Sequence, residues 1–247
     1  MQHYNDYIFS RMDQMRPGDL PHGKADILVS EILGTLLLGE SALEFTADAR
    51  KHLLKPGARI VPAVGSQFVT LVQSADLESI TSVRNWGGFD LLGFNRLQDT
   101  ASVVFTKQYG FRFSQLAHVN LSERISIADV DFHVDDFEPE DDDLERRYRV
   151  TALADGTVHA ALFSWEVHSD VEKKYSMTTH PEDTLDNFAR DMQWGQAMQL
   201  IEDHTSPDVE VCGCPVPLVV TAGELLDIVV KYSSNGVLIQ TLVERVA

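Results

Sequence analysis

The chain has few cysteines, few basic residues and no long apolar run, and each shortage excludes a class of protein. Its 247 residues include two cysteines, Cys212 and Cys214, which are too few for a four-ligand zinc site and fit no disulfide framework. No segment approaches the roughly 18 to 20 apolar residues of a membrane helix, and the first residues lack the basic and apolar regions of a signal peptide. We therefore expect a protein inside the cell, in the cytoplasm or the nucleus, with no membrane partner and no metal site.

The shortage of basic residues also argues against direct binding to nucleic acid. Lys and Arg number 20 against 38 Asp and Glu, for a formal net charge of -18, whereas phosphate backbones attract positive side chains. The acidic run at 135–145 holds eight carboxylates in eleven residues. Its first interpretation is a solvated loop, and the alternative is attraction of a basic substrate.

Residues 25–57 have the pattern of one piece of an α/β sheet. The apolar run ADILVS at 25–30 is typical of a strand buried on both faces of a parallel sheet. The segment SALEFTADARKHLLKPG at 41–57 predicts a helix, with Ser41 and Glu44 as a capping box and a stop at the Lys-Pro-Gly end. The order strand, loop, helix follows from these two segments.

After residue 57 the hydrophobic period changes to that of strands, and many short strands predict a barrel or a sandwich. Asp155-Gly156 predicts a hairpin between two of them. In RISIADVDFHV the alternation slips by one residue after Ile127, which indicates a β-bulge. Residues 76–100 fit neither pattern and are predicted to form a helical insertion.

Glu31 and Glu40 stand at the two ends of an apolar loop that follows the predicted strand. Active sites of α/β sheets lie at the carboxyl ends of the strands, so two carboxylates fixed there point to chemistry. A pair of this kind can do acid–base work on a sugar, hold a divalent metal, or bind a guanidinium. Spacing alone does not separate these possibilities from two surface residues at loop ends.

The stretch DILVSEILGTLLLGESAL resembles the double-glutamate loop of the protein arginine methyltransferases. Further stretches resemble that family in the same order along nearly the whole chain: PHGKADILVSE, GTVHAALFSWEV, SMTTHP and MQWGQAMQLIE. The residues that fall on the family's patterns are Asp26, Ser30, Glu31, Gly34, Glu40, Ser41, Gly156, His159, Trp165, Thr179, Pro181, Trp194 and Gln196. Within the family, the chain looks most similar to the branch with two tandem modules, which includes the monomethylating (type III) enzymes.

This resemblance implies a fold of class α/β followed by β. Residues 1–57 would be the C-terminal portion of a Rossmann-like methyltransferase domain that uses S-adenosylmethionine. Residues 58–247 would form a β-barrel substrate domain with a helical arm at about 76–100. In the family such an arm docks on a partner, so a homodimer or pairing with a second module is expected.

The resemblance also implies transfer of a methyl group from S-adenosylmethionine to an arginine guanidinium in a protein, in basic substrates. Glu31 and Glu40 would hold the guanidinium. Trp194 would wall the pocket, supported by Gln196, with Gln193 beside them. Met12 and Asp13 match positions that contact the adenine of the cofactor.

Two departures from the family pattern bear on activity. Gln193 stands where the family has a histidine, which marks either a monomethylating site or sequence drift. No glycine-rich loop precedes residue 25, so we expect activity to require an upstream glycine-rich segment. The first alternative is a catalytically inactive acidic β-barrel module that binds arginine-rich proteins, and a paired-carboxylate hydrolase ranks last.

Overall fold

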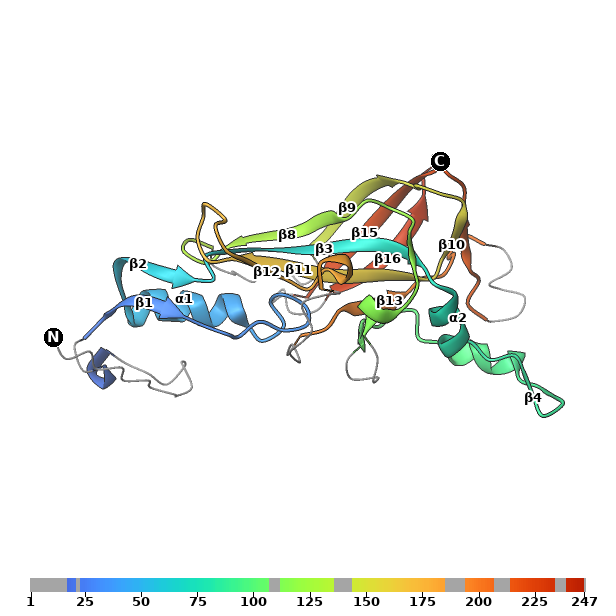
Figure 1. The fold of residues 1–247 in the computed structure, drawn as a ribbon, viewed down its shortest axis with the longest axis horizontal. Coiled ribbons are helices and arrows are strands. Elements are labelled where there is room, and N and C mark those ends of the chain that lie inside the picture. Colours follow the sequence, from blue (N-terminus) through green and yellow to red (C-terminus); the bar gives the residue numbers. More distant parts are fainter. Residues whose placement is uncertain are drawn as a thin grey trace.

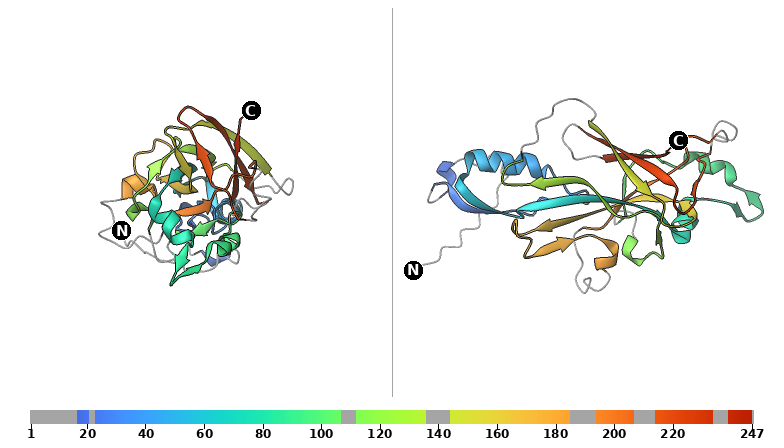
Figure 2. Two further views of the ribbon diagram at one scale, coloured as in Figure 1. Left: turned by 90° about the vertical axis from the view of Figure 1, so that its right-hand side faces the viewer. Right: turned by 90° about the horizontal axis from the view of Figure 1, so that it is seen from above.

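A computed structural model describes residues 17–20, 23–106, 112–135, 144–184, 194–206, 214–233 and 239–246. The molecule is elongated, with a small α/β unit at one end, β-sheets in the middle and a projecting arm at the other end (Figure 1). Figure 2 shows the molecule end-on, down this long axis, and from above. In the part of the chain that the structure describes, no helix is long and apolar enough to cross a membrane.

The α/β unit consists of β1 (Ala25–Val29), α1 (Ala42–His52) and β2 (Leu54–Val61), with β1 and β2 paired in parallel. The strand and the helix confirm the predicted order. The helix ends earlier than expected, because Lys55, Pro56 and Gly57 lie inside β2 and do not stop α1.

The capping box predicted at Ser41 is wrong. Ser41 adopts a left-handed backbone with φ 57° and ψ 34°, and its side chain makes no capping hydrogen bond. A capping serine ordinarily has an extended backbone, from which its hydroxyl can reach the third amide of the helix. The sequence Ser-x-x-Glu is present here without the backbone that the motif requires.

The remaining strands form several sheets. The largest has the order β6–β13–β11–β3–β7, with β8 also on β3 and β12 also on β11. A second sheet has the order β16–β15–β9, and β10 pairs with β14. Among the described residues these pairings do not join into one closed sheet. The bounds are β3 (Val64–Gln73), β6 (Val104–Phe105), β7 (Val119–Asn120), β8 (Ile125–Asp131), β9 (Leu144–Thr151), β10 (Gly156–Val158), β11 (Ala160–His168), β12 (Ser176–Thr178), β13 (Ala197–Leu200), β14 (Leu218–Val220), β15 (Leu225–Tyr232) and β16 (Ile239–Arg245).

The hairpin predicted at Asp155-Gly156 does not form. β9, which precedes it, pairs with β15, and β10, which follows it, pairs with β14. An Asp-Gly pair favours a two-residue hairpin only when both flanking strands pair with each other. Here both flanking strands pair with segments more than fifty residues away.

The bulge predicted after Ile127 is confirmed. The register between β3 and β8 shifts between Gln67 and Phe68, which leaves Ile127 as the extra residue. Its carbonyl accepts hydrogen bonds from the hydroxyls of Tyr148 at 2.7 Å and Tyr232 at 2.5 Å. Burial raises the pKa of the Tyr232 hydroxyl, which therefore stays protonated as a donor. The bulge thus links the largest sheet to the sheet of β9, β15 and β16.

The core lies between these two sheets. Its buried side chains come from β3, β8 and β11 on one side and from β9, β15 and β16 on the other. A second cluster joins the α/β unit to the largest sheet, and it includes Trp165 and Phe132. Two short helical segments also lie against the sheets, η5 (Phe113–Gln115) and α3 (Pro181–Thr184), and η2 (Pro17–Asp19) precedes β1.

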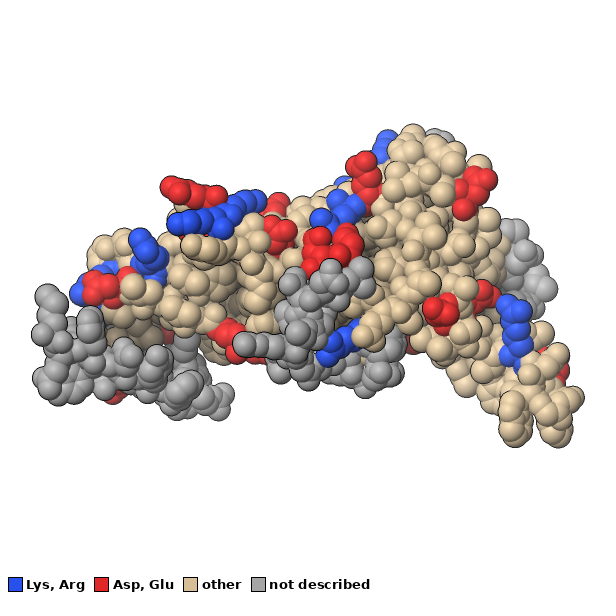
Figure 3. Space-filling model, viewed as in Figure 1, with Lys and Arg blue, Asp and Glu red and all other residues tan. Residues whose placement is uncertain are grey.

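The arm at residues 75–98 projects from the end of β3. It contains α2 (Ala75–Thr81), a hairpin of β4 (Asn85–Trp86) and β5 (Phe89–Asp90), and the 3₁₀ helix η3 (Leu92–Leu97). Seven large apolar side chains are exposed on it: Ile80, Val83, Trp86, Phe89, Leu92, Phe94 and Leu97. Figure 3 shows that the tip of the arm is free of charged side chains on the face in view.

We predict that Tyr232→Phe lowers the free energy of unfolding by about 0.5–1.5 kcal/mol, because it removes one buried hydrogen bond to the bulge. Equilibrium unfolding in urea measures this change. Tyr175→Phe is the matched control, since Tyr175 is exposed and its loss of a hydroxyl should change nothing. Equal stability of the two variants would contradict the assigned role of the bulge.

Candidate active site

The loop at residues 30–41 packs its apolar interior against the largest sheet. Leu33, Leu36 and Leu37 are 3%, 2% and 1% exposed, whereas Glu31 and Glu40 at the two ends are exposed. Burying the leucines holds the loop down, because apolar side chains leave water for the core. The apolar interior therefore fixes the loop and leaves both carboxylates at the surface.

Three side chains from the sheet region also hold the backbone of this loop. The indole of Trp165 donates to the Gly34 carbonyl at 3.0 Å, and the indole of Trp194 donates to the Leu33 carbonyl at 2.5 Å. The two indole rings meet edge to face, with their centroids 5.4 Å apart. The amide N–H of Leu37 donates to the side-chain oxygen of Gln67 at 2.8 Å. The irregular loop thus receives the hydrogen bonds that a buried backbone requires.

Gly34 and Gly39 bring the two arms of the loop together. A Cβ added to Gly34 would lie 2.7 Å from the Gly39 Cα, and one added to Gly39 would lie 2.9 Å from the Leu36 carbonyl oxygen. Both distances are shorter than normal van der Waals contacts, so an added Cβ atom would clash with the backbone at either position. The close approach therefore requires glycine at both positions.

Both predicted catalytic carboxylates are available for a ligand. Among the described residues, neither Glu31 nor Glu40 has a hydrogen bond or an ion pair with another side chain. Glu31 lines an open cavity of about 230 Å³ at the carboxyl ends of β1 and β2. Glu40 lies outside the described lining of that cavity, next to the first turn of α1.

Trp194 and Gln196 occupy different layers of the site. Trp194 contacts the loop directly through Leu33. Gln196 is buried behind it and donates to the Thr179 carbonyl at 2.9 Å, while the Thr179 hydroxyl accepts from the Trp165 amide at 2.9 Å. Gln196 therefore supports Trp165 through Thr179. The predicted residues Gln193, Met12 and Asp13 lie outside the described residues.

Sequence reasoning missed Gln67 and a group of polar residues beside the site. Gln67 is a polar residue in step with the buried apolar positions Val69 and Leu71 of β3, which is the signal that could have identified it. Its side-chain amide donates to the Ser164 carbonyl at 2.8 Å while its oxygen accepts from Leu37. One glutamine therefore joins the loop to β11.

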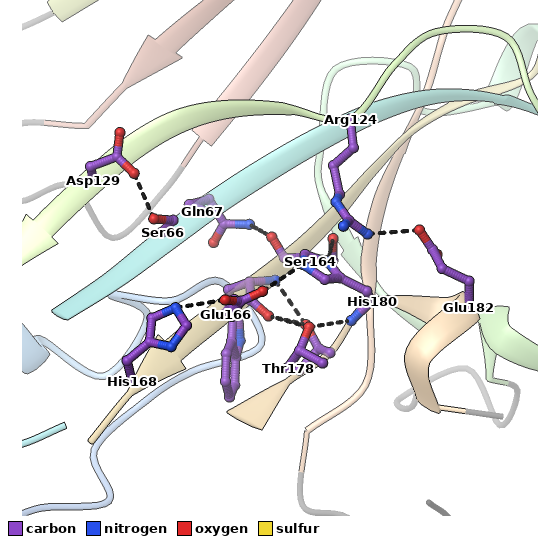
Figure 4. Close-up of polar contacts among 12 residues, drawn as sticks. Ser66, Gln67, Arg124, Asp129, Ser164, Glu166, His168, Thr178, His180 and Glu182 are labelled. Atoms are coloured by element: carbon purple, nitrogen blue, oxygen red, sulfur yellow. Dashed lines mark hydrogen bonds and ion pairs between the residues drawn. The ribbon is translucent and has the colours of Figure 1, made fainter. Parts of the chain in front are cut away.

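The missed polar group centres on Glu166 (Figure 4). The Glu166 carboxylate lies 2.6 Å from His168 Nε2 and 3.6 Å from His180 Nε2. His180 Nδ1 lies 2.7 Å from the Ser164 hydroxyl. Burial lowers the pKa of His180, and the positive charge of Arg124 lowers it further. In the part of the chain that the structure describes, no group of three or more His, Cys, Asp or Glu is arranged to hold a metal ion.

We predict that Gly34→Ala destabilises the chain by more than ~1 kcal/mol, because its methyl group would force the loop away from Gly39. Urea unfolding measures the loss, and the fluorescence of Trp165 and Trp194 reports whether the loop has moved. Gly93→Ala is the control, because a Cβ at Gly93 meets nothing within 4 Å. If the Gly34 variant matched the Gly93 variant, the close approach would not matter to stability.

We predict that stability falls as the pH drops below about 6.5, the ordinary pKa of histidine. The lowered pKa of folded His180 means that the unfolded chain binds a proton first, so acid favours unfolding by up to ~1.4 kcal/mol per pH unit. Urea unfolding between pH 7 and pH 5 measures this slope. His180→Asn keeps an acceptor for Ser164 and cannot titrate, so its slope should be smaller; an unchanged slope would assign the effect to other groups. The charged groups that face His180 are Glu166, Arg124, Glu182 and Asp183.

Comparison with known proteins finds several similar sequences. No protein-family model matches the chain. It is 32% identical over 145 residues to an arginine N(omega)-methyltransferase of Streptomyces achromogenes subsp. streptozoticus, covering 59% of this chain and 37% of that protein. It is 29% identical to protein arginine N-methyltransferase 7 of Caenorhabditis briggsae, and the match covers 72% of this chain and 27% of that protein. It is 26% identical to protein arginine N-methyltransferase 1 of Dictyostelium discoideum, and the match covers 75% of this chain and 50% of that protein.

A solved structure shares the fold. The structure of the Trypanosoma brucei PRMT1 enzyme–prozyme heterotetrameric complex with AdoHcy matches with a TM-score of 0.61 and 18% sequence identity, covering 89% of this chain and 60% of that one. The chain spans about a quarter to a half of the length of the curated relatives described above. By sequence, the chain is similar to part of the length of several protein arginine N-methyltransferases, and it shares the fold of a solved structure from that group.

Proposed function

We propose that the chain is the substrate-binding part of an enzyme that transfers a methyl group from S-adenosylmethionine to the guanidinium of arginine in proteins. The observation that carries the proposal is the position of two carboxylates, Glu31 and Glu40, at the ends of a loop anchored by two indoles. Neither carboxylate has a side-chain partner among the described residues. The relatives described above are all named as methyltransferases. Nothing in their names favours a non-catalytic binding module.

The chemistry of arginine explains why two carboxylates are needed. A guanidinium stays protonated in water, with a pKa above about 12. Carboxylates on two sides accept its N–H groups and draw the positive charge toward the nitrogens that face them. The remaining nitrogen becomes more electron-rich and is held in one orientation. This preorganisation lowers the activation barrier to methyl transfer. Trp194 would wall this pocket, and Gln196 would hold Trp165 behind it.

The described residues do not themselves form a cradle for the cofactor, which supplies the electrophilic methyl group when bound. No glycine-rich loop precedes β1 in the sequence. The described part of β1 pairs with β2 alone, and Ile27 and Val29 are 56% and 73% exposed. Parallel strands ordinarily have covered faces and neighbours on both sides. We therefore propose that a further segment with the glycine-rich loop completes the sheet at this edge.

The same proposal extends to the finer architecture and to assembly. The packed sheets of residues 58–247 would close into a β-barrel around their shared core. The exposed apolar side chains of the arm would be covered by a second copy or by a second module. Apolar side chains gathered on one projection are typical of interaction surfaces. The trypanosomal neighbour is itself described as a heterotetrameric complex.

A second candidate is methylation of arginine that is not part of a protein. The Streptomyces relative, at 32% identity, is named for arginine and not for protein arginine. Both candidates use the same carboxylate pair. They are separated by supplying labelled methyl donor with either free L-arginine or an arginine-rich peptide and finding which becomes labelled.

We predict that Glu31→Gln and Glu40→Gln each reduce methyl transfer by roughly 30- to 5000-fold, because losing one carboxylate from a desolvated charge pair costs about 2–5 kcal/mol. The assay uses the chain fused behind the cofactor segment of a related arginine methyltransferase. Glu44→Gln is the control, since Glu44 is exposed on α1 and its neutralisation should leave the rate unchanged. Near-normal rates in both loop variants would refute the guanidinium clamp.

A further inference from the structure

The loop at residues 30–41 is held on the sheet in two halves. The first half, next to Glu31, is held by the two indole N–H groups described above. The second half, next to Glu40, is held through the amide N–H of Leu37, which donates to the side-chain oxygen of Gln67 at 2.8 Å. The position of Glu31 therefore depends on the indoles, and the position of Glu40 depends on Gln67.

A hydrogen-bonded turn carries the position of Leu37 to Glu40. The amide N–H of Gly39 donates to the Leu36 carbonyl at 2.8 Å, so the turn begins before Leu37 and ends directly before Glu40. A flexible connection would absorb a displacement of Leu37, whereas a turn closed by a hydrogen bond passes it on. A change in the contact with Gln67 is therefore expected to move the Glu40 carboxylate.

One face of β3 fixes both the backbone and the side chain of Leu37. Gly65 and Gln67 are two residues apart in the strand, so they share a face, and both are buried. A Cβ added to Gly65 would lie 3.1 Å from the Leu37 side chain and 3.0 Å from that of Val167. Gln67, which binds the Leu37 amide, is 2% exposed. Leu37 thus has little room to move on the strand.

Gln67 also refers the second half of the loop to the same strand as the first half. Its side-chain amide donates to the Ser164 carbonyl at 2.8 Å. The next residue of β11 is Trp165, whose indole holds the first half at Gly34. Two consecutive residues of β11 therefore position the two halves, and Gln67 makes the connection to the second.

We propose that Gln67 is a positioning residue for methyl transfer, which sets the place of Glu40 relative to Glu31 so that both carboxylates meet one guanidinium. This inference rests on the proposed function. Gln67 does not contact the substrate and acts through the backbone of the loop. A misplacement of about 1 Å caused far from the reacting atoms can lower a rate by about 100-fold, so a buried contact of this kind matters to catalysis.

The first test is Gln67→Met, which keeps the length of the side chain and removes both hydrogen bonds. In the whole chain, hydrogen exchange at the Leu37 amide, followed by NMR, should become about 10- to 100-fold faster. In the fused enzyme described above, kcat should fall about 10- to 100-fold while KM changes less than about threefold, because both carboxylates remain to attract the guanidinium. Gln73→Met is the matched control. Gln73 accepts from the Thr157 amide at 2.7 Å at the far end of the same strand, so its loss should leave kcat unchanged.

The second test, Gln67→Glu, makes the donor to Ser164 depend on pH. The protonated carboxyl can accept from Leu37 and donate to the Ser164 carbonyl, whereas the ionised carboxylate has no donor. Burial raises the pKa of such a carboxyl above its ordinary value of about 4.3. The kcat of this variant relative to the unmutated enzyme should be near one at about pH 6 and fall more than about tenfold by about pH 9. His180, which contacts the Ser164 hydroxyl, is present in both proteins, so the ratio removes its contribution.

The outcomes separate this inference from the proposed function. Unchanged exchange at Leu37 or unchanged kcat in Gln67→Met would overturn the positioning role while the unmutated enzyme still methylates. A Gln67→Glu ratio that does not vary with pH, or an equal loss of kcat in Gln73→Met, would overturn it as well. Near-normal rates in both Glu31→Gln and Glu40→Gln would overturn the proposed function and this inference together, because Gln67 would then have no catalytic carboxylate to position.

Discussion

Two indole N–H groups that donate to consecutive carbonyls, Trp165 to Gly34 and Trp194 to Leu33, fix the position of the candidate site. These contacts join residues 131 and 161 positions apart along the chain. The loop that they hold has no strand or helix of its own to satisfy its backbone. Without these donors, buried carbonyls would have to seek water, which costs more than the net value of an ordinary hydrogen bond. The α/β unit and the sheets are therefore coupled at the place where the carboxylates stand.

The composition of the loop follows from this anchoring. Leucines at 33, 36 and 37 supply burial, and glycines at 34 and 39 supply the close approach that lets the anchored backbone fold back on itself. Charged residues are tolerated only where the loop leaves the surface of the sheet, which is at its ends. Glu31 and Glu40 are therefore separated by the buried apolar residues that hold the loop on the sheet.

Local patterns predicted the local structure well, and failures arose where distant segments decide. The strand at 25–29, the helix after Ser41 and the bulge at Ile127 depend on the period of apolar residues, which the sequence displays directly. The hairpin at Asp155-Gly156 failed because strand pairing is set by distant partners, β15 and β14, and no turn signal encodes them. The capping box failed because Ser41 has a left-handed backbone, from which its side chain makes no capping hydrogen bond.

The candidate site was predictable only in the part that a short motif carries. Glu31 and Glu40 lie at the ends of the loop, and Trp194 donates to the Leu33 carbonyl within it. Gln67 and the histidines around Glu166 come from strands whose side chains alternate between faces. Their meeting depends on the register between β3, β11 and β12. A register is fixed by packing across the whole sheet, so these residues are visible only once the sheet is assembled.

The two carboxylates at the ends of the loop stand in different surroundings. Glu40 is followed by the start of α1, where backbone N–H groups and the helix dipole favour a negative charge. Glu31 follows a strand and lines an open cavity that His168 also lines. Glu40 therefore lies beside the first turn of a helix, whereas Glu31 lies beside an open cavity. One anchored loop thus places its two terminal carboxylates in unequal environments, because the loop joins the end of a strand to the start of a helix.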